Sequence, residues 1–283
     1  MQVAVSMWSL HREAQAGRID TAGFVGWAAD EGFAGVELLN LFWRDPGREV
    51  PEVRRLCEGL GVHVAAYDAT NDFGILEPKA RRAQLEQVRR DIDTAVSLGA
   101  PVLRVFAGGE HAKVRYEDVK RTIEESLAEV AAYAAQAGVV LALENHPGPA
   151  GRIRNMLDAI RFVNLAHMRV NLDPANFLLC DEDPREAAAQ LADVVAHVHV
   201  KDLASLPGSA GATEEGTLLR SLAGRAYKGV VVGGGDVPWA SVLGSLHARS
   251  YRGWLSIEYE GEGDARAGVI ESRANLLAIL RSL

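Results

Sequence analysis

The strongest constraint on the fold is an alternation of short apolar segments with longer amphipathic segments, repeated eight times along the chain. The apolar segments have the length of strands, and the segments between them have the length and pattern of helices. The expected strands are Val3–Ser6, Gly35–Leu39, Val62–Tyr67, Pro101–Phe106, Val139–Glu144, Met168–Asp173, Val194–Val200 and Trp254–Glu258. The expected helices are Thr21–Glu31, Pro51–Leu60, Lys79–Leu98, Tyr116–Ala137, Ile153–Val163, Pro184–Leu191, Pro238–His247 and Ala265–Arg281.

Several joints between a helix and the next strand have the same form. Gly32, Gly61, Gly99 and Gly138 each stand just past a predicted helix end, where glycine commonly terminates a helix. Strict alternation of strand and helix implies parallel strands joined by right-handed crossovers. The pattern therefore predicts a series of compact β/α units.

Eight such units favour an α/β protein of the closed (β/α)8 TIM barrel type. The 283 residues are close to the usual length of one such barrel, so we expect a single domain over residues 1–283. The main alternative is an open doubly wound sheet. Its dinucleotide-binding form needs a glycine-rich turn after the first strand, and the segment Met7–His11 contains no glycine.

One segment breaks the alternation. Residues Leu203–Tyr227 contain the sequence PGSAGATEEG and precede an extra apolar run, Gly229–Val232. A connection of this length in a compact domain is typical of a lid or a binding loop, and it is equally consistent with a disordered surface insertion.

Charge and cysteine content limit the possible partners and compartments. The net charge of −8 disfavours binding to nucleic acid and to anionic membranes. Cys57 and Cys180 form no Cys-x-x-Cys pair, which fits a reducing cytoplasm. The N-terminal segment lacks the features of a signal peptide, and no apolar run has the roughly 20 residues that a membrane span needs. We expect a cytoplasmic enzyme, and homo-oligomerisation remains possible.

Reactive side chains end four consecutive predicted strands. Glu144, Asp173, His199 and Glu258 stand at or near the carboxyl ends of the fifth to eighth strands, where barrel enzymes place their active sites. Because alternate residues of a strand point to opposite faces, the neighbouring leucine, valine and isoleucine residues direct these four toward the barrel interior.

Three crowded carboxylates repel one another, and a divalent cation removes that repulsion. Oxygen ligands with one imidazole suit Mn2+ best in our interpretation, with Co2+, Mg2+ or Zn2+ as alternatives. Taken singly, Asp173 before Pro174 is equally typical of a helix cap, and a lone histidine is more typical of a core residue. Four such residues in register favour one metal ion.

The segments ALENH, NLDPANF, HVHVKD, GGGDVPW and GWLSIEYEG resemble those of the xylose-isomerase-like barrel superfamily. That group includes sugar isomerases, ketose 3-epimerases, inosose dehydratases and endonuclease IV. The resemblance implies that Glu144, Asp173, His199 and Glu258 are metal ligands, and that Glu144 and Glu258 also transfer protons. Asn176 stands where the epimerases have a substrate-contacting histidine.

Further candidates share a predicted place on the barrel interior or on the loops above it, from which they would contact substrate. Arg104 is expected to be buried and to need an acidic partner, either Glu37 or a glutamate of the metal site. Either a structural ion pair or direct substrate contact would fit it, and His146 is equally consistent with a proton donor or a surface residue. The candidate substrate-binding residues are Trp8, Glu37, Arg104, His146, Asn176 and Lys201.

These residues predict an isomerase or epimerase that acts on a neutral keto-sugar or polyol through an enediolate. A dehydratase or a carbon–glycosyl lyase would begin in the same way. A DNA-repair endonuclease with three zinc ions is disfavoured because its additional histidines are missing at Asn176 and at Asp236–Pro238. A non-catalytic binding protein is disfavoured because unused buried carboxylates are costly.

Overall fold

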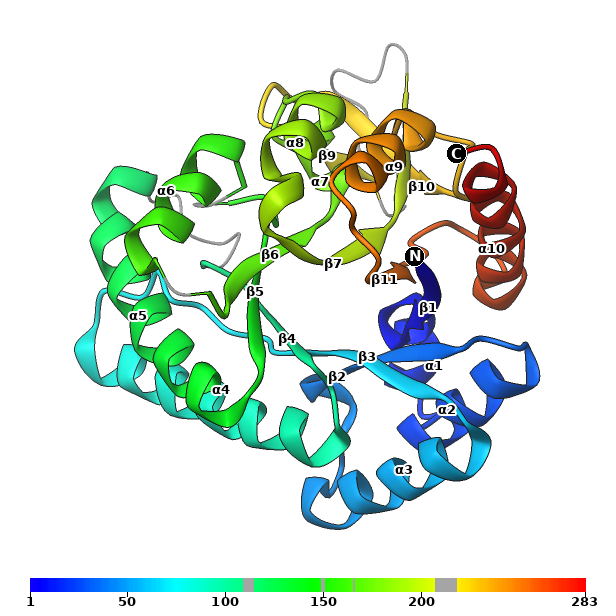
Figure 1. Ribbon diagram of the computed structural model, residues 1–283, viewed down its shortest axis with the longest axis horizontal. Coiled ribbons are helices and arrows are strands. Elements are labelled where there is room, and N and C mark those ends of the chain that lie inside the picture. Colours follow the sequence, from blue (N-terminus) through cyan, green and yellow to red (C-terminus); the bar gives the residue numbers. More distant parts are fainter. Residues whose placement is uncertain (109–114, 149–150, 165, 207–217) are drawn as a thin grey trace.

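Eight parallel strands close into a barrel, and helices surround it (Figure 1). The computed structural model describes residues 1–108, 115–148, 151–164, 166–206 and 218–283. Around the barrel the strands follow the order β1–β11–β7–β6–β5–β4–β3–β2. Their bounds are β1 Gln2–Ser6, β2 Gly35–Leu39, β3 His63–Asp68, β4 Val102–Val105, β5 Val140–Glu144, β6 Met168–Leu172, β7 Val195–Val200 and β11 Trp254–Ile257.

The helices lie between consecutive barrel strands and cover the outside of the barrel (Figure 1). They are α1 His11–Gln15, α2 Thr21–Asp30, α3 Pro46–Leu60, α4 Pro78–Leu98, α5 Tyr116–Ala137, α6 Ile153–Val163, α7 Pro174–Leu179, α8 Pro184–Leu191, α9 Trp239–Ala248 and α10 Ala265–Arg281. Short 3-10 turns η1 Met7–Leu10, η2 Asn40–Phe42 and η3 Ala192–Val194 join some of these elements. No helix of the described residues has both the length and the apolar character needed to cross a membrane.

The structure confirms the predicted (β/α)8 barrel and each of its eight strands, with boundaries that move by at most one residue. The expected glycine caps are also present: Gly32, Gly61, Gly99 and Gly138 have φ angles of 72°, 68°, 71° and 75°. The expected start of α3 at Pro51 is wrong. The helix begins at Pro46, whose fixed φ suits a first helical position, and Pro51 lies inside it.

The apolar core lies mainly between the barrel and its helices. Valine, leucine and isoleucine side chains of the strands pack outward against buried residues of the helices. A separate small cluster, Ala66, Val102 and Ala142, shares the inward face of three neighbouring strands. Small residues in that layer leave the space above them to the long polar side chains near the strand ends.

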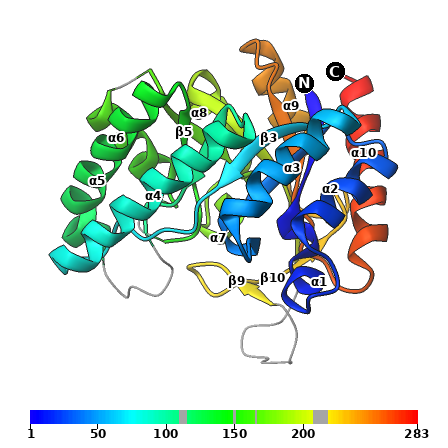
Figure 2. The same ribbon diagram turned by 90° about the horizontal axis from the view of Figure 1, so that it is seen from below.

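The described residues of the segment after β7 form a small antiparallel sheet, which the sequence did not predict. Strands β8 Asp202–Ser205, β9 Leu219–Arg220 and β10 Ala226–Val230 form this sheet, in the order β8–β10–β9. Figure 2 shows β9 and β10 at one end of the barrel and both chain termini at the other. Residues 207–217, where we predicted a lid or a disordered insertion, lie outside the described residues.

Asp202 fastens the glycine-rich segment 233–235 to the end of β7. Its Oδ2 accepts hydrogen bonds from the backbone N–H groups of Gly233 and Gly235 at 2.8 and 3.3 Å, and its Oδ1 accepts from Val237 at 3.2 Å and from Leu203 at 2.9 Å. A Cβ atom at Gly235 would lie 2.2 Å from Asp202 Oδ1, so this close approach requires glycine.

We expect the Asp202→Ala substitution to lower the free energy of unfolding by about 2–4 kcal/mol, because several buried N–H groups lose a charged acceptor. Asp236→Ala is the matched control, since Asp236 Oδ2 accepts one hydrogen bond from the exposed residue Ser205. Denaturant unfolding of both variants measures the difference. Equal losses of stability in the two variants would contradict this anchoring role.

Candidate metal centre and active site

Four side chains converge at the carboxyl ends of adjacent barrel strands. Glu144 is the last residue of β5, Asp173 follows β6, His199 lies on β7 and Glu258 follows β11. All four are buried, with exposed fractions of 5% or less. The strand register explains their common height, because parallel pairing aligns β5 with β6, β6 with β7, and β7 with β11.

The distances between these groups suit a shared cation better than direct hydrogen bonds. Nδ1 of His199 lies 3.7 Å from Glu144 Oε2 and 3.7 Å from Glu258 Oε2, beyond hydrogen-bond range. Ligand atoms of Glu144, Asp173 and His199 all lie within 4.8 Å of one another. Metal–ligand bonds of about 2.0–2.3 Å place neighbouring ligand atoms roughly 3–4 Å apart. Both ring nitrogens of His199 and Oδ2 of Asp173 are buried without a hydrogen-bond partner among the described residues, so the donor set fits a divalent ion.

The pKa values of the buried groups reflect this concentration of charge. Burial alone would lower the pKa of His199, but the carboxylates of Glu37, Glu258 and Glu144 raise it well above its usual value. Burial raises the pKa of Asp173 to about 7, although Lys201 opposes this shift. The pKa of Glu144 is held below its usual value, against the effect of burial, by His199 and Arg104.

Asp173 combines the two roles that its sequence position suggested. Its Oδ1 caps helix α7 by accepting hydrogen bonds from Ala175 N at 3.0 Å and from Asn176 N at 3.3 Å. Asn145 holds its backbone in place through two hydrogen bonds of 2.8 and 2.7 Å. The helix cap therefore orients the carboxylate and leaves Oδ2 facing the other site residues.

Lys201 lies among the acidic side chains of the site. Its Nζ is 2.9 Å from Asp173 Oδ2, 3.1 Å from Glu258 Oε2 and 3.9 Å from Glu260 Oε2. The ammonium is buried and offsets part of the negative charge. Glu260 was not among the predicted residues, although its place two residues after Glu258 gives it the same strand-end position. Its Oε1 accepts a 2.8 Å hydrogen bond from the indole N–H of Trp8.

Arg104 has two acidic partners. Its Nη2 donates to Asp68 Oδ2 at 2.9 Å, and its Nε lies 3.2 Å from Glu144 Oε2. A glutamate of the proposed metal site was one of the expected partners, whereas Asp68 was not. Asp68 ends β3 as Glu144 ends β5, and that equivalence was the available signal. The guanidinium also lies over the Phe106 ring, 4.1 Å from its centroid.

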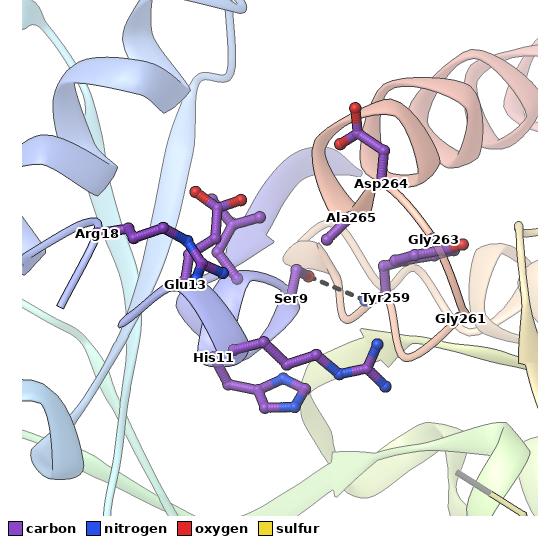
Figure 3. Close-up of a pocket in the computed structure, with 11 residues that line it drawn as sticks. Ser9, His11, Glu13, Arg18, Tyr259, Gly261, Gly263, Asp264 and Ala265 are labelled. Atoms are coloured by element: carbon purple, nitrogen blue, oxygen red, sulfur yellow. Dashed lines mark hydrogen bonds between the residues drawn. The ribbon is translucent and has the colours of Figure 1, made fainter. Parts of the chain in front are cut away.

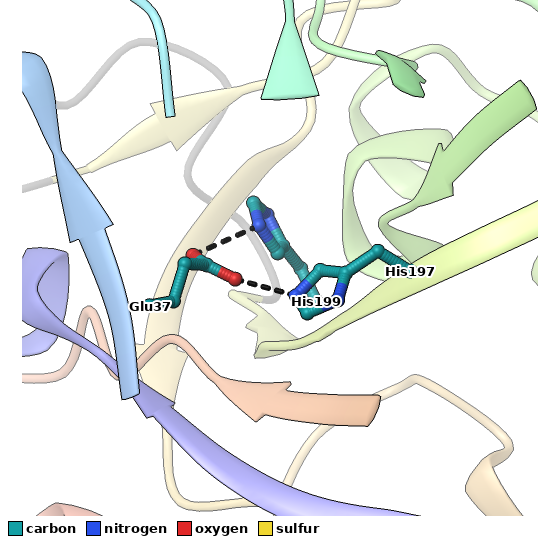
Figure 4. A group of neighbouring side chains, drawn as sticks. All are labelled: Glu37, His197 and His199. Atoms are coloured by element: carbon teal, nitrogen blue, oxygen red, sulfur yellow. Dashed lines mark hydrogen bonds and ion pairs between the residues drawn. The ribbon is translucent and has the colours of Figure 1, made fainter. Parts of the chain in front are cut away.

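Glu37 has a setting different from the expected one. It faces the barrel interior but is fully buried and lies away from the pocket wall, against His197 and His199 (Figure 4). Its Oε2 is 2.5 Å from His197 Nε2, and its Oε1 is 3.1 Å from His199 Nε2. These contacts come from β2 and β7, which face each other across the barrel.

An open pocket of about 690 Å3 lies above these groups. Of the expected site residues, Asp173, His199 and Glu37 do not line it and lie beneath its floor. The expected residues in its wall are Trp8, Arg104, Glu144, His146, Asn176, Lys201 and Glu258. Asn176 Nδ2 donates to Glu144 Oε1 at 3.0 Å, so this residue touches a proposed ligand directly.

A smaller pocket of about 160 Å3 lies beside the loop after β11 (Figure 3). At its wall, the Ser9 hydroxyl donates to Ile257 O at 3.0 Å and accepts from Tyr259 N at 2.9 Å. These two bonds hold the residues on either side of Glu258. Ser9, which the sequence did not single out, thereby fixes the backbone that carries a candidate ligand.

The family model of the xylose isomerase-like TIM barrel matches residues 25–279. The chain belongs to this family. It is 26% identical over 245 residues to the rhizopine catabolism protein MocC of Rhizobium meliloti, covering 81% of this chain and 71% of that protein. It is 27% identical over 265 residues to 3-dehydroshikimate dehydratase of Pseudomonas aeruginosa, covering 90% of this chain and 38% of that longer protein.

Solved structures share the fold at lower sequence identity. The IolI protein, solved with a zinc atom, superposes with a TM-score of 0.81 at 14% identity, over 100% of this chain and 99% of that one. This likeness extends over the whole barrel and agrees with the observed topology.

We expect purified protein to bind one divalent ion per chain, because one set of four ligands converges at the strand ends. His199→Ala should lower the affinity for that ion at least tenfold. Elemental analysis gives the stoichiometry, and competition with a chromophoric chelator gives the affinity. Unchanged affinity in the variant would place the ion elsewhere.

Proposed function

We propose that this protein is a divalent-metal-dependent isomerase or epimerase of a neutral keto-sugar or polyol. The observation that carries the proposal is the pairing of Glu144 and Glu258: both line the pocket, and both lie 3.7 Å from the same His199 nitrogen. Glu144, Asp173, His199 and Glu258 would hold the ion, with Mn2+ the first choice and Co2+, Mg2+ or Zn2+ as alternatives.

When bound, the ion would polarise a substrate carbonyl and make the adjacent carbon more acidic. Against the effect of burial, His199 and Arg104 keep Glu144 ionised and so able to accept a proton, although the same contacts weaken it as a base. Arg104 and Asn176 contact its two carboxylate oxygens and fix its orientation. We assign to Glu258, beside the Lys201 ammonium, the return of the proton on the other face of the carbon.

The pocket wall supports a sugar-like substrate. The Trp8 indole stacks on His11 with ring centroids 4.5 Å apart, and its N–H is fixed by Glu260. Phe106 and His146 form a second ring pair, 4.7 Å apart. Aromatic faces suit the apolar side of a sugar ring, while Asn176 and the carboxylates suit its hydroxyl groups.

The distribution of positive charge supports a substrate without phosphate. The backbone N–H groups of Gly233 and Gly235 donate to Asp202 and that of Gly234 donates to Val231 O, so they are not available to a phosphate. Lys201 and Arg104 have carboxylate partners inside the site. Arg225 pairs with Asp181 at 2.7 Å outside the main pocket, so it does not converge with Arg12, Arg104 and Lys201, which line that pocket.

A dehydratase is the second candidate, and two observations favour it. The chain matches a 3-dehydroshikimate dehydratase over most of its own length, and His146 lines the pocket two residues beyond Glu144. In this reaction a carboxylate would remove the proton next to the carbonyl. His146 would protonate the hydroxyl group on the following carbon, which would leave as water with the electrons of the broken C–H bond forming the new double bond.

Glu144→Gln and Glu258→Gln should each lower kcat by about 10²–10⁴, because each removes a proton-transferring carboxylate. The measurement is steady-state turnover at saturating metal, with bound metal quantified in each variant. Asp72→Asn is the control. Asp72 lines the same pocket, is distant in the sequence from the four ligands, and its Oδ1 accepts a hydrogen bond from Gly74 N. Near-normal turnover in either glutamate variant would exclude the two-carboxylate mechanism.

We expect free keto-sugars and inososes to be preferred over their phosphate esters. Assays in deuterated water distinguish the two reactions: an epimerase places solvent deuterium on carbon without loss of water, whereas a dehydratase forms a conjugated enone. The comparison uses matched free and phosphorylated sugars. A higher kcat/KM for the phosphorylated member would overturn the neutral-substrate assignment.

A further inference from the structure

The proposed ligand set leaves two buried groups without a role. Glu37 on β2 and His197 on β7 are both 0% exposed, and neither lines the pocket. They lie beneath His199 and contact each other and His199 (Figure 4). A buried carboxylate is costly unless it is paired, so these contacts need an explanation.

The two ring nitrogens of His199 lie in different environments. Nε2 faces Glu37 Oε1 at 3.1 Å, whereas Nδ1 faces Glu144 Oε2 and Glu258 Oε2 at 3.7 Å. A neutral imidazole carries one proton on either nitrogen, and the hydrogen bond at one nitrogen decides which. The contact between Nε2 and Oε1 is an ion-pair contact rather than an aligned hydrogen bond, and the negative charge of the carboxylate, which can only accept, favours the proton on Nε2.

We propose that Glu37 is a positioning residue that holds His199 through Nε2 and thereby presents Nδ1 as the metal ligand. His197 in turn holds Glu37 in place. This inference rests on the metal-dependent function proposed above. Histidine ligands of metals commonly donate their other N–H to a carboxylate, which fixes the orientation of the ring and raises its basicity. Here the carboxylate comes from the opposite side of the barrel.

His197 completes the arrangement because it occupies the other oxygen of Glu37. Its Nε2 lies 2.5 Å from Oε2, so each carboxylate oxygen has its own imidazole partner. The two histidine rings are perpendicular, with centroids 5.8 Å apart, as expected when two residues of one strand approach a single carboxylate. Glu37 therefore cannot rotate toward the pocket without losing both contacts.

The Glu37→Gln variant tests this role with little change in volume. A glutamine is neutral and offers one accepting oxygen, so two imidazoles compete for it. We expect metal affinity to fall 10–100-fold, measured by chelator competition. Turnover should recover when the metal concentration is raised, because Glu37 does not contact the substrate. A loss of turnover that persists at saturating metal would contradict a positioning role.

Ser256→Ala is the matched control. Ser256 is buried on β11 and pairs in register with His199, and its hydroxyl oxygen lacks a hydrogen-bond partner among the described residues. Its removal should leave metal affinity within twofold of wild type. Equal effects of the Ser256 and Glu37 substitutions would show a general packing disturbance and would overturn the proposal. His197→Gln should give an intermediate loss, because the contact between Glu37 and His199 remains.

A measurement on the unmodified chain keeps the proposal testable if Glu37→Gln does not fold. Two-bond 1H–15N spectra of zinc-loaded protein report which ring nitrogen carries the proton. We expect His199 to carry it on Nε2, and a proton on Nδ1 would overturn the proposal. In metal-free protein, two downfield Nε2–H signals should persist. If wild-type protein shows these signals but takes up no metal, the proposed metal-dependent function is wrong and the Glu37 contacts remain supported. If the signals are absent, the Glu37 contacts themselves are refuted.

Discussion

Buried negative charge is the constraint on which the rest of the site depends. Five carboxylates, those of Glu37, Asp68, Glu144, Asp173 and Glu258, are buried where the barrel strands end. Each would be unfavourable alone, and each has a cationic or imidazole neighbour. Arg104 joins Asp68 to Glu144, Lys201 joins Asp173 to Glu258, and the two histidines hold Glu37. The proposed divalent ion would complete this compensation.

The barrel makes this concentration of charge possible because its strands are parallel and closed. Every strand ends at the same face, so residues distant in the sequence meet without long connections. Small side chains such as Ala66 and Ala142 fill the layer below. Backbone contacts then fix individual groups, as Ser9 does on both sides of Glu258 and Asn145 does for Asp173. The polar groups of the site are thus held by the strand ends and by hydrogen bonds from the residues beside them.

The sequence was sufficient for the barrel and for the four converging residues, because both arise from periodic patterns. Strand alternation placed Glu144 and Glu258 toward the interior, and the structure agrees. It could not determine which side chains pair. Asp68 pairs with Arg104 on the neighbouring strand, and Glu260 pairs with Trp8. The strand-end position of Asp68 was a signal that it faces the site, but periodicity does not show which side chain it contacts. The small sheet of β8, β9 and β10 was not predicted for a similar reason, because its strand pairing is set by long-range contacts.

Under the proposed mechanism, the same arrangement could serve more than one reaction. In the proposed reaction, removal of a proton next to a carbonyl would need only the proposed metal ligands and the carboxylate held by Arg104 and Asn176. The fate of the resulting enediolate depends on which acid is within reach of the substrate: a second carboxylate returns the proton to carbon, whereas an imidazole near a hydroxyl favours loss of water. In this chain Glu258 and His146 both line the pocket. In the proposed function, the position of the substrate hydroxyl relative to these two residues would decide between epimerisation and dehydration, and the pocket-lining Trp8, Phe106 and Asn176 would set that position.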